Sequence, residues 1–399
     1  MTDNRIHQLR LAAGLTLDDL VKRLADSGVS ITKQALSNYE KSKRIPKPTI
    51  LMALAKALNV KAAYLISEPS IKIEWLSYRC KTALRAYEKE EIQAQAADRA
   101  ERYMYLQNLL FPDTKPNLPE RHAASFDDAE EASKALRKSW KLGNAPIDSV
   151  TRTIESNGGV VVEIHHDNVK FDGLSGFING CFPLIAVNIS VSDDRIRLNL
   201  AHELGHLGMK CTDLDAKTNE KMAFRFASSF LIPAEVMKYE IGKMRRTFGF
   251  QELGLLKQKY GISMQALLYR MRDLKIITEP TYRSACAEFN RNEWKKKEPV
   301  EFIGIEKPMR FKQMVFRALS EGVITSIKAE ELFPGITKEL KKEEGEINSR
   351  SMKPSDLIKL PYSERLRILS EMAKAAEKSY AEDKDLKEFE AFGEDDLHD

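Results

Sequence analysis

The chain has 399 residues, 43% of them hydrophobic and 31% charged, which favours a soluble globular protein of two to four domains. No apolar run approaches the roughly 18 residues needed to span a bilayer and no apolar leader follows Met1, so we expect neither a membrane anchor nor secretion. The four cysteines form no CxxC pair, which favours a reducing cytoplasm.

The net charge of +4 is unevenly distributed along the chain. Residues 1–70 carry 11 Lys and Arg against 6 Asp and Glu, whereas residues 381–399 carry 9 acidic residues against 2 lysines. The net charges of +5 and −7 indicate that the N-terminal end can bind an anionic polymer and that the C-terminal end cannot.

Residues 5–66 alternate short amphipathic helical patterns with polar turns and show no strand signal. Thr16 is the predicted N-cap of one helix, and the turn DSGVS separates that helix from TKQALSNYEK. We expect a small all-α unit of four or five helices. Its predicted core comprises Leu20, Leu36, Tyr39 and Leu54.

This segment resembles the XRE-type helix-turn-helix (Cro/C1-like) of phage-repressor-like regulators, most specifically over LSNYEKSKRIPKPTILMALAKAL. The resemblance implies double-stranded DNA as a partner, with the second helix in the major groove and dimeric binding. A helical protein-interaction module with a basic rim is the alternative. The residues placed to contact bases are Thr32, Lys33, Gln34, Ser37 and Asn38, and those placed to contact phosphates are Lys41, Lys43 and Arg44.

The pattern of residues 71–118 predicts a helical segment. It ends at FPDTKPNLP, whose three prolines mark a domain boundary. Beyond it, GVVVEIHH and PLIAVNI are predicted buried strands, and residues 195–208 and 219–231 are predicted helices. Helical patterns resume after residue 246.

The run His202-Glu203-Leu204-Gly205-His206 lies within one of these predicted helices. Residues four apart share a helix face, so the two imidazoles can take two corners of a tetrahedral Zn²⁺ site. Glu203 lies about 100° round the helix from His202, where it can take a proton from a water molecule on the metal. The alternative, a surface helix with solvated histidines, is disfavoured by the apolar LNLA before and LGHL after.

A catalytic zinc ion needs a third protein ligand. Glu220 lies on the same stripe of its predicted helix as Ala223 and Ala227, which directs its carboxylate toward the core. We expect Glu220 to be that ligand. Three alternatives remain open: Cys211, Asp213 and Asp215.

Three blocks, GLSGFINGCFPLIAVN, DDRIRLNLAHELGHL and NEKMAFRFASSFLIP, resemble the ImmA/IrrE family of zinc metallopeptidases in order and spacing, across about residues 140–235. The resemblance implies a zincin-like fold, Zn²⁺ held by His202, His206 and Glu220, and Glu203 as the catalytic base. Members of the family usually carry Asn or Asp where Phe224 stands. That departure bears on how firmly the metal is held.

Together these features predict a cytoplasmic regulator in which a DNA-binding domain is fused to a zinc endopeptidase. Relatives are implied to cleave a repressor-like or antitoxin-like protein and so relieve repression. The alternative is a DNA-binding regulator or antitoxin with an inactive or structural metal site, which Phe224 favours.

The C-terminal tail weakly resembles the partner-binding end of small antitoxins. Its apolar stripe could bind the toxin encoded by a neighbouring gene; a disordered, solubilising tail is the alternative. The stripe comprises Leu366, Ile368, Leu369 and Met372.

We therefore expect a multidomain, mostly α chain: an all-α helix-turn-helix domain, an α+β zincin-like metallopeptidase domain and a helical C-terminal extension. The expected regions are 1–70 (DNA-binding domain), 71–119 (helical linker), 120–245 (metallopeptidase domain), 246–345 (helical extension) and 346–399 (helical, then acidic tail).

Overall fold

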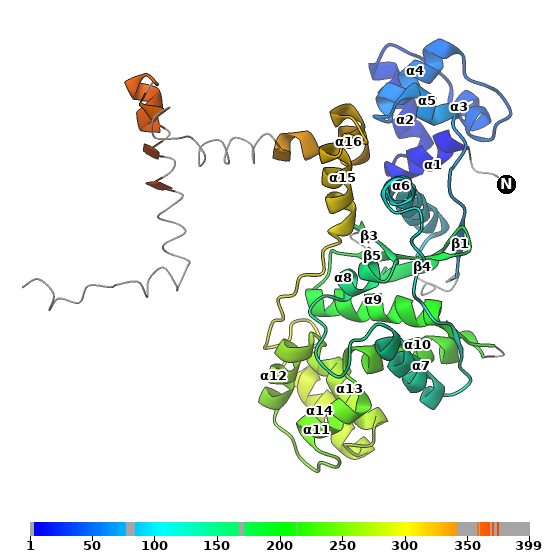
Figure 1. Cartoon of the computed structure of the whole chain (residues 1–399). Coiled ribbons are helices and arrows are strands. Elements are labelled where there is room, and N and C mark those ends of the chain that lie inside the picture. The colour runs from blue at the N-terminus through cyan, green and yellow to red at the C-terminus, as the bar shows by residue number, and fades with distance from the viewer. Residues whose placement is uncertain are drawn as a thin grey trace, which may run out of the picture. The chain divides into compact units, whose positions relative to one another are not determined.

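The computed structural model describes residues 4–76, 84–166, 171–212, 214–340, 357–358, 360–367, 369–370 and 373–374. Two compact units make up the chain, Met1–Ala318 and Leu319–Asp399. Helices dominate the described residues and two small sheets accompany them, which confirms the mostly α, multidomain fold class (Figure 1). Ile368, Met372 and the acidic residues 381–399 of the predicted tail lie outside the described residues.

The N-terminal region is all-α, as expected. Its helices are α1 (Arg5–Ala12), α2 (Leu17–Asp26), α3 (Lys33–Glu40), α4 (Pro48–Ala57) and α5 (Ala62–Ile66). The side chain of Thr16 accepts a hydrogen bond from Asp19 N, and the carboxylate of Asp19 accepts one from Thr16 N, so the predicted N-cap is confirmed as a capping box. The four predicted core residues are also confirmed, since Leu20, Leu36, Tyr39 and Leu54 are all buried.

A buried network joins α1 to α6 (Ala86–Leu110). Both guanidinium nitrogens Nη1 and Nη2 of Arg5 donate to the carboxylate of Glu101, the latter at 2.8 Å. The Arg5 guanidinium lies 4.5 Å from the centre of the Tyr64 ring, and the backbone N and Oγ of Ser70 each donate to Glu101 Oε1 at 2.9 Å. Glu101 therefore holds both the first helix and the segment that follows α5.

Four strands form a mixed sheet in the order β1–β4–β5–β3. They are β1 (Ile73–Trp75), β3 (Val160–Ile164), β4 (Gly173–Ile178) and β5 (Phe182–Asn188). The two predicted strands are confirmed as β3 and β5, which are parallel, whereas β4 is antiparallel to both β1 and β5. β1 lies in a segment that the sequence predicts to be helical.

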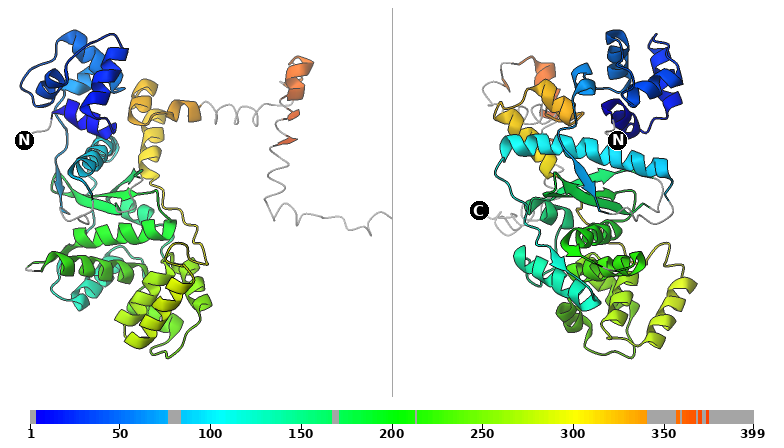
Figure 2. Two further views of the ribbon diagram at one scale, coloured as in Figure 1. Left: turned by 180° about the vertical axis from the view of Figure 1, so that it is seen from behind. Right: turned by 90° about the vertical axis from the view of Figure 1, so that its right-hand side faces the viewer.

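Helices cover both faces of this sheet. α6 lies on one face and α9 (Asp193–Gly208) on the other (Figures 1 and 2). The β4–β5 turn contains Asn179 at φ 51° and Gly180 at φ 67°, the left-handed conformation that a type I′ hairpin turn requires. A second, two-stranded sheet pairs β2 (Arg121–His122) with β6 (Met209–Lys210) in parallel.

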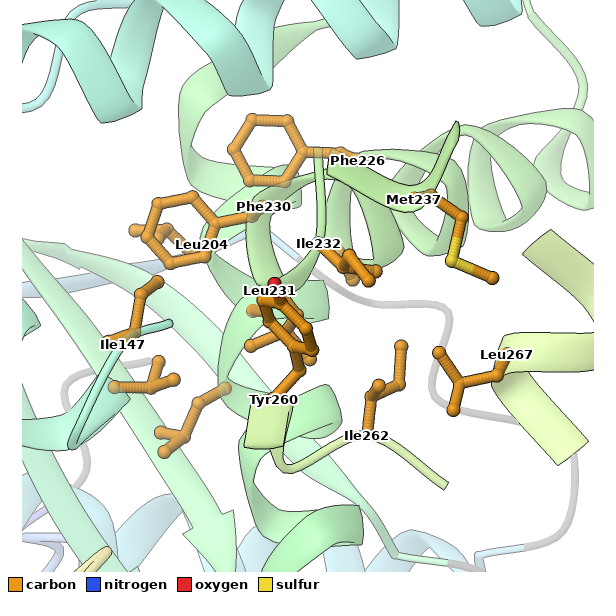
Figure 3. Packing of buried hydrophobic residues seen from close by; sticks show 14 of the residues in the cluster. Ile147, Leu204, Phe226, Phe230, Leu231, Ile232, Met237, Tyr260, Ile262 and Leu267 are labelled. Carbon is orange, nitrogen blue, oxygen red and sulfur yellow. The ribbon is translucent and has the colours of Figure 1, made fainter. Parts of the chain in front are cut away.

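A continuous apolar core extends from the sheet face that α9 covers, past α9, to the helices beyond it. In Figure 3, Phe226 and Phe230 lie close to Leu204, and Tyr260 and Ile262 reach the same core from later in the chain. The helical extension therefore shares its core with the region before it. The contributing helices are α7 (Phe126–Ser139), α8 (Val150–Ser156), α9, α10 (Ala216–Leu231), α11 (Ala234–Ile241), α12 (Phe250–Tyr260), α13 (Met264–Asp273) and α14 (Glu279–Arg291).

Two further helices follow, α15 (Arg310–Ser320) and α16 (Ser326–Leu332). Throughout the part of the chain that the structure describes, no helix combines the length and the apolar character needed to cross a membrane.

Glu155 on α8 is a buried carboxyl group whose hydrogen bonding is incomplete. Its Oε2 accepts a long bond of 3.4 Å from Arg310 N, and its Oε1 has no partner among the described residues. Burial raises the pKa of Glu155 from 4.5 to about 7. The folded protein therefore retains a proton here that the unfolded chain releases at lower pH.

We expect this proton to make stability depend on pH. Because the pKa is higher in the folded state, the free energy of unfolding of the wild type should fall relative to Glu155→Gln as the pH rises from about 4.5 to about 7, by up to about 3 kcal/mol. Urea unfolding of both proteins at several pH values across this window measures the difference. The same pH dependence in both proteins would contradict the prediction.

Candidate metal centre

The two histidines of the HExxH run lie one turn apart on α9, as expected. Their Nε2 atoms are 3.1 Å apart and the ring planes are nearly perpendicular, at 85°. The helix starts after Ser192 with Asp193 and Asp194 in its first turn, where negative charge stabilises a helix N-terminus. Most of its second half is buried, and the side chains of His202 and His206 are only 10% and 9% exposed.

Glu220 reaches the same point from α10. Its Oε2 lies 3.3 Å from His202 Nε2, and its Oε1 lies 3.4 Å from His206 Nε2. Gly205 permits this approach of the two helices, because a Cβ atom there would lie 3.0 Å from the Phe226 ring. The structure thus brings together the three side chains that the sequence nominates as metal ligands.

These three side chains could hold a metal ion. One candidate ligand atom from each lies within 4.8 Å of the others, and no second such group occurs among the described residues. Zinc-ligand bonds of about 2.0–2.2 Å at tetrahedral angles would place neighbouring ligand atoms roughly 3.3 Å apart. The two Nε2 atoms, 3.1 Å apart, fit that spacing, and each lies 3.3 or 3.4 Å from a different oxygen of the Glu220 carboxylate.

The charges around the group also suit a cation. Burial alone would raise the pKa of Glu220, but hydrogen bonds to His202 and His206 and their charges keep that pKa well below its ordinary value. Burial lowers the pKa of His206, but the contact with Glu220 and the charge of Glu203 outweigh it, and the pKa of His206 is raised. The carboxylates therefore favour positive charge at His206, which a metal ion would supply in place of a proton.

The alternative ligands lie elsewhere or cannot be placed. Asp215 caps α10: its Oδ1 accepts from Lys217 N and Thr218 N at 2.9 and 3.1 Å, and its Oδ2 accepts from the Thr218 hydroxyl. Burial raises the pKa of the Cys211 thiol, which disfavours the thiolate that binds metals. Asp213 lies outside the described residues.

Glu203, on the same helix, faces β4. Ser175 Oγ donates to Glu203 Oε2 at 2.6 Å, and both side chains are buried. A Cβ atom at Gly173 would lie 2.9 Å from Glu203 Cγ, so glycine makes room for the carboxylate. Ser175 and Gly173 were not among the predicted site residues, although both lie in GLSGFI and alternate residues share one face of a strand.

Phe224 packs against His202, with the ring centres 4.2 Å apart. His202 Nδ1 is buried and has no hydrogen-bond partner among the described residues. A metal-bound histidine almost always donates its other ring N–H to a carboxylate, a carbonyl or water, which fixes the ring orientation. None of the described residues gives His202 that support, and the aromatic ring of Phe224 packs beside it.

The predicted DNA contacts surround α3. Thr32 also caps this helix, because its hydroxyl accepts from Ala35 N at 3.1 Å. Lys33 Nζ lies 2.6 Å from Asp18 Oδ2 in an exposed ion pair. The exposed members of the set are Thr32, Lys33, Gln34, Lys41, Lys43 and Arg44, and the half-buried members are Ser37 and Asn38.

Two family models match the chain. Residues 6–65 match the helix-turn-helix model, and residues 157–272 match the model described as the IrrE N-terminal-like domain. The predicted fusion of an XRE-type helix-turn-helix with an ImmA/IrrE-like domain is confirmed, and the second match contains the whole of α9 and α10. No curated protein matches the chain. The protein thus joins a DNA-binding domain to a metallopeptidase-like domain.

Proposed function

We propose that this protein is a DNA-binding transcriptional regulator whose zinc-dependent endopeptidase domain cleaves a repressor-like or antitoxin-like protein and so relieves repression. The observation that carries the proposal is the division of roles on α9. His202 and His206 each lie within 3.4 Å of an oxygen of Glu220, while Glu203 accepts a hydrogen bond from Ser175 and remains available as a base. Metal-assisted hydrolysis needs that division.

Within this proposal His202, His206 and Glu220 hold Zn²⁺. When bound, the ion polarises the scissile carbonyl and acidifies the attacking water. Glu203 takes the proton of that water and passes it to the leaving amine. Ser175 donates to Oε2 and so positions the carboxylate, which leaves Oε1 for the proton.

Incubating the purified protein and Zn²⁺ with the product of the neighbouring gene tests this function. We expect two fragments, whose new termini identify the cleaved bond. An intact partner after incubation under conditions that relieve repression in cells would count against the peptidase proposal.

A regulator with an inactive or structural metal site is the second candidate. Two observations favour it: the Phe224 ring packs against the His202 ring, and His202 Nδ1 has no hydrogen-bond partner among the described residues. If the missing support weakens metal binding, Phe224→Asn should strengthen it by roughly tenfold to a hundredfold, because the amide oxygen can accept from Nδ1. Competition for Zn²⁺ with a chromophoric chelator measures the affinity. Phe224→Leu is the matched control, since it removes the ring and adds no acceptor. Equal affinities for the Asn and Leu variants would contradict this reading.

We propose that the helix-turn-helix domain binds a specific duplex as a dimer, with α3 in the major groove. Lys33→Ala and Gln34→Ala should each cost roughly 1–3 kcal/mol and relax base preference. Lys43→Ala should weaken binding to all sequences alike and lower the salt dependence. Fluorescence anisotropy with the protein's own promoter and a shuffled duplex, at several salt concentrations, separates these effects. Unchanged promoter binding in all three variants would contradict the proposed DNA surface.

A further inference from the structure

β4 is the strand that contacts Glu203, and its outer edge is covered by β1. Ser175 takes part in both contacts. Its hydroxyl donates to Glu203 Oε2 at 2.6 Å, and its backbone carbonyl accepts from Leu76 N, just after β1, at 3.0 Å. An extended chain on this edge is therefore hydrogen-bonded to Ser175, the residue that positions the Glu203 carboxylate.

The pairing of β1 with β4 is short. It spans three residue pairs, Ile73 with Ile178, Glu74 with Phe177 and Trp75 with Gly176, whereas β4 pairs with β5 over six. Edge strands of this length contribute few hydrogen bonds and little buried area. β1 is thus far easier to displace from β4 than β5 is.

Gly176 has no side chain, so the backbone of a neighbouring strand can approach this edge closely whatever side chains that strand carries. A Cβ atom there would lie 2.6 Å from the Glu74 carbonyl oxygen and 3.1 Å from Trp75 Cα. Strand addition uses main-chain hydrogen bonds for affinity and alternate side chains for specificity. In β1, Ile73 and Trp75 are half-buried, while Lys72, Glu74 and Leu76 are exposed. An incoming strand would accordingly place apolar side chains at alternate positions.

We infer that β1 is an inhibitory strand: it occupies the outer edge of β4, where an extended segment of the protein substrate would pair, and must leave that edge before the substrate can bind. The inference rests on the proposed peptidase function and names what controls access to its site. Ser70 remains bound to Glu101 on α6, so β1 can leave the edge while the chain before it stays attached.

Glu74→Pro should free the edge. The bonds from Asn179 N to the Lys72 carbonyl and from Leu76 N to the Ser175 carbonyl fix the antiparallel alternation, which directs the N–H of Glu74 toward β4. Proline lacks that donor. Glu74→Ala is the matched control, because it keeps the donor and loses the same side chain.

The probe is a fluorescent peptide, PSIKIEWLSY, which copies residues 69–78. We expect Glu74→Pro to bind it at least about tenfold more tightly than Glu74→Ala or the wild type, because the tethered strand no longer competes. A peptide of the same composition in shuffled order should bind more weakly. Equal binding to the Pro and Ala variants, with unchanged circular dichroism, would overturn the inference.

A reversible lock provides an independent test with the protein substrate. Cysteines at positions 73 and 178 would face each other across a non-hydrogen-bonded pair, where opposite side chains lie closest and the spacing suits a disulfide. The oxidised Ile73→Cys, Ile178→Cys protein should lose cleavage and regain it on reduction, unlike either single variant. Undiminished cleavage by the locked protein would overturn this inference and leave the peptidase proposal intact. Tight peptide binding by Glu74→Pro, with no cleavage by any form of the protein, would support the inference about the strand edge and contradict the peptidase proposal.

Discussion

Replacing Glu220 with alanine should remove the metal ion from the protein. The carboxylate contacts both imidazoles, so its loss leaves two ligands for an ion that needs at least three from the protein. We expect about one Zn²⁺ per chain in the wild type and almost none in Glu220→Ala after dialysis against a weak chelator. Elemental analysis of the purified proteins measures this content.

Asp215→Ala is the control for that measurement. Asp215 caps the same helix without approaching the candidate ligand atoms, so this variant should retain its metal at a modest cost in stability. Zinc held by Glu220→Ala as tightly as by the wild type would contradict the assignment. The third ligand would then be sought at Asp213 or Asp215.

Replacing Glu203 with glutamine should abolish cleavage while leaving metal content, fold and DNA binding unchanged. Glutamine has the same shape and can still accept from Ser175, but it cannot take a proton from water. Loss of a general base typically lowers the rate on the order of a hundredfold to ten-thousandfold. Initial rates of partner cleavage by the two zinc-loaded proteins give the ratio.

The cleavage rate of Ser175→Ala should fall between those of the wild type and Glu203→Gln, because this variant keeps the base and loses only the hydrogen bond that positions it. His202→Ala, in contrast, should lose both metal and cleavage. A Glu203→Gln variant as fast as the wild type would exclude Glu203 as the base.

The helices and the candidate ligands could be predicted because their signals are local. His202 and His206 share a face through helical periodicity alone, and Thr16 signals an N-cap from its own sequence context. Glu220 was selected from the stripe it shares with Ala223 and from the family resemblance. The distance from Glu220 to the histidines depends on how Gly205 of α9 packs against Phe226 of α10. The pattern of one helix cannot predict that contact between two helices.

The strands next to the site were harder to predict. β1 has three residues, too few for a period-2 pattern, and it pairs with a strand about 100 residues away. β4 was missed although Asn179-Gly180, a recognised hairpin signal, follows it. Without β4 in place, the contact between Ser175 and Glu203 could not be foreseen. His202 Nδ1 has no hydrogen-bond partner among the described residues. This too could not be predicted, because it depends on how His202 and Phe224 pack in the folded protein.

The central claim, that the protein relieves repression by cutting another protein, is tested most directly by the size of that partner on a blot from stressed cells. Cells carry either the wild-type protein or Glu203→Gln, at matched levels, with a tagged partner and a reporter for the repressed promoter. With the wild type we predict a shortened partner and an active reporter; with Glu203→Gln we predict an intact partner and a silent reporter. Equal reporter activity in both strains, with the partner intact in both, would contradict the claim and leave a regulator built on an inactive protease scaffold.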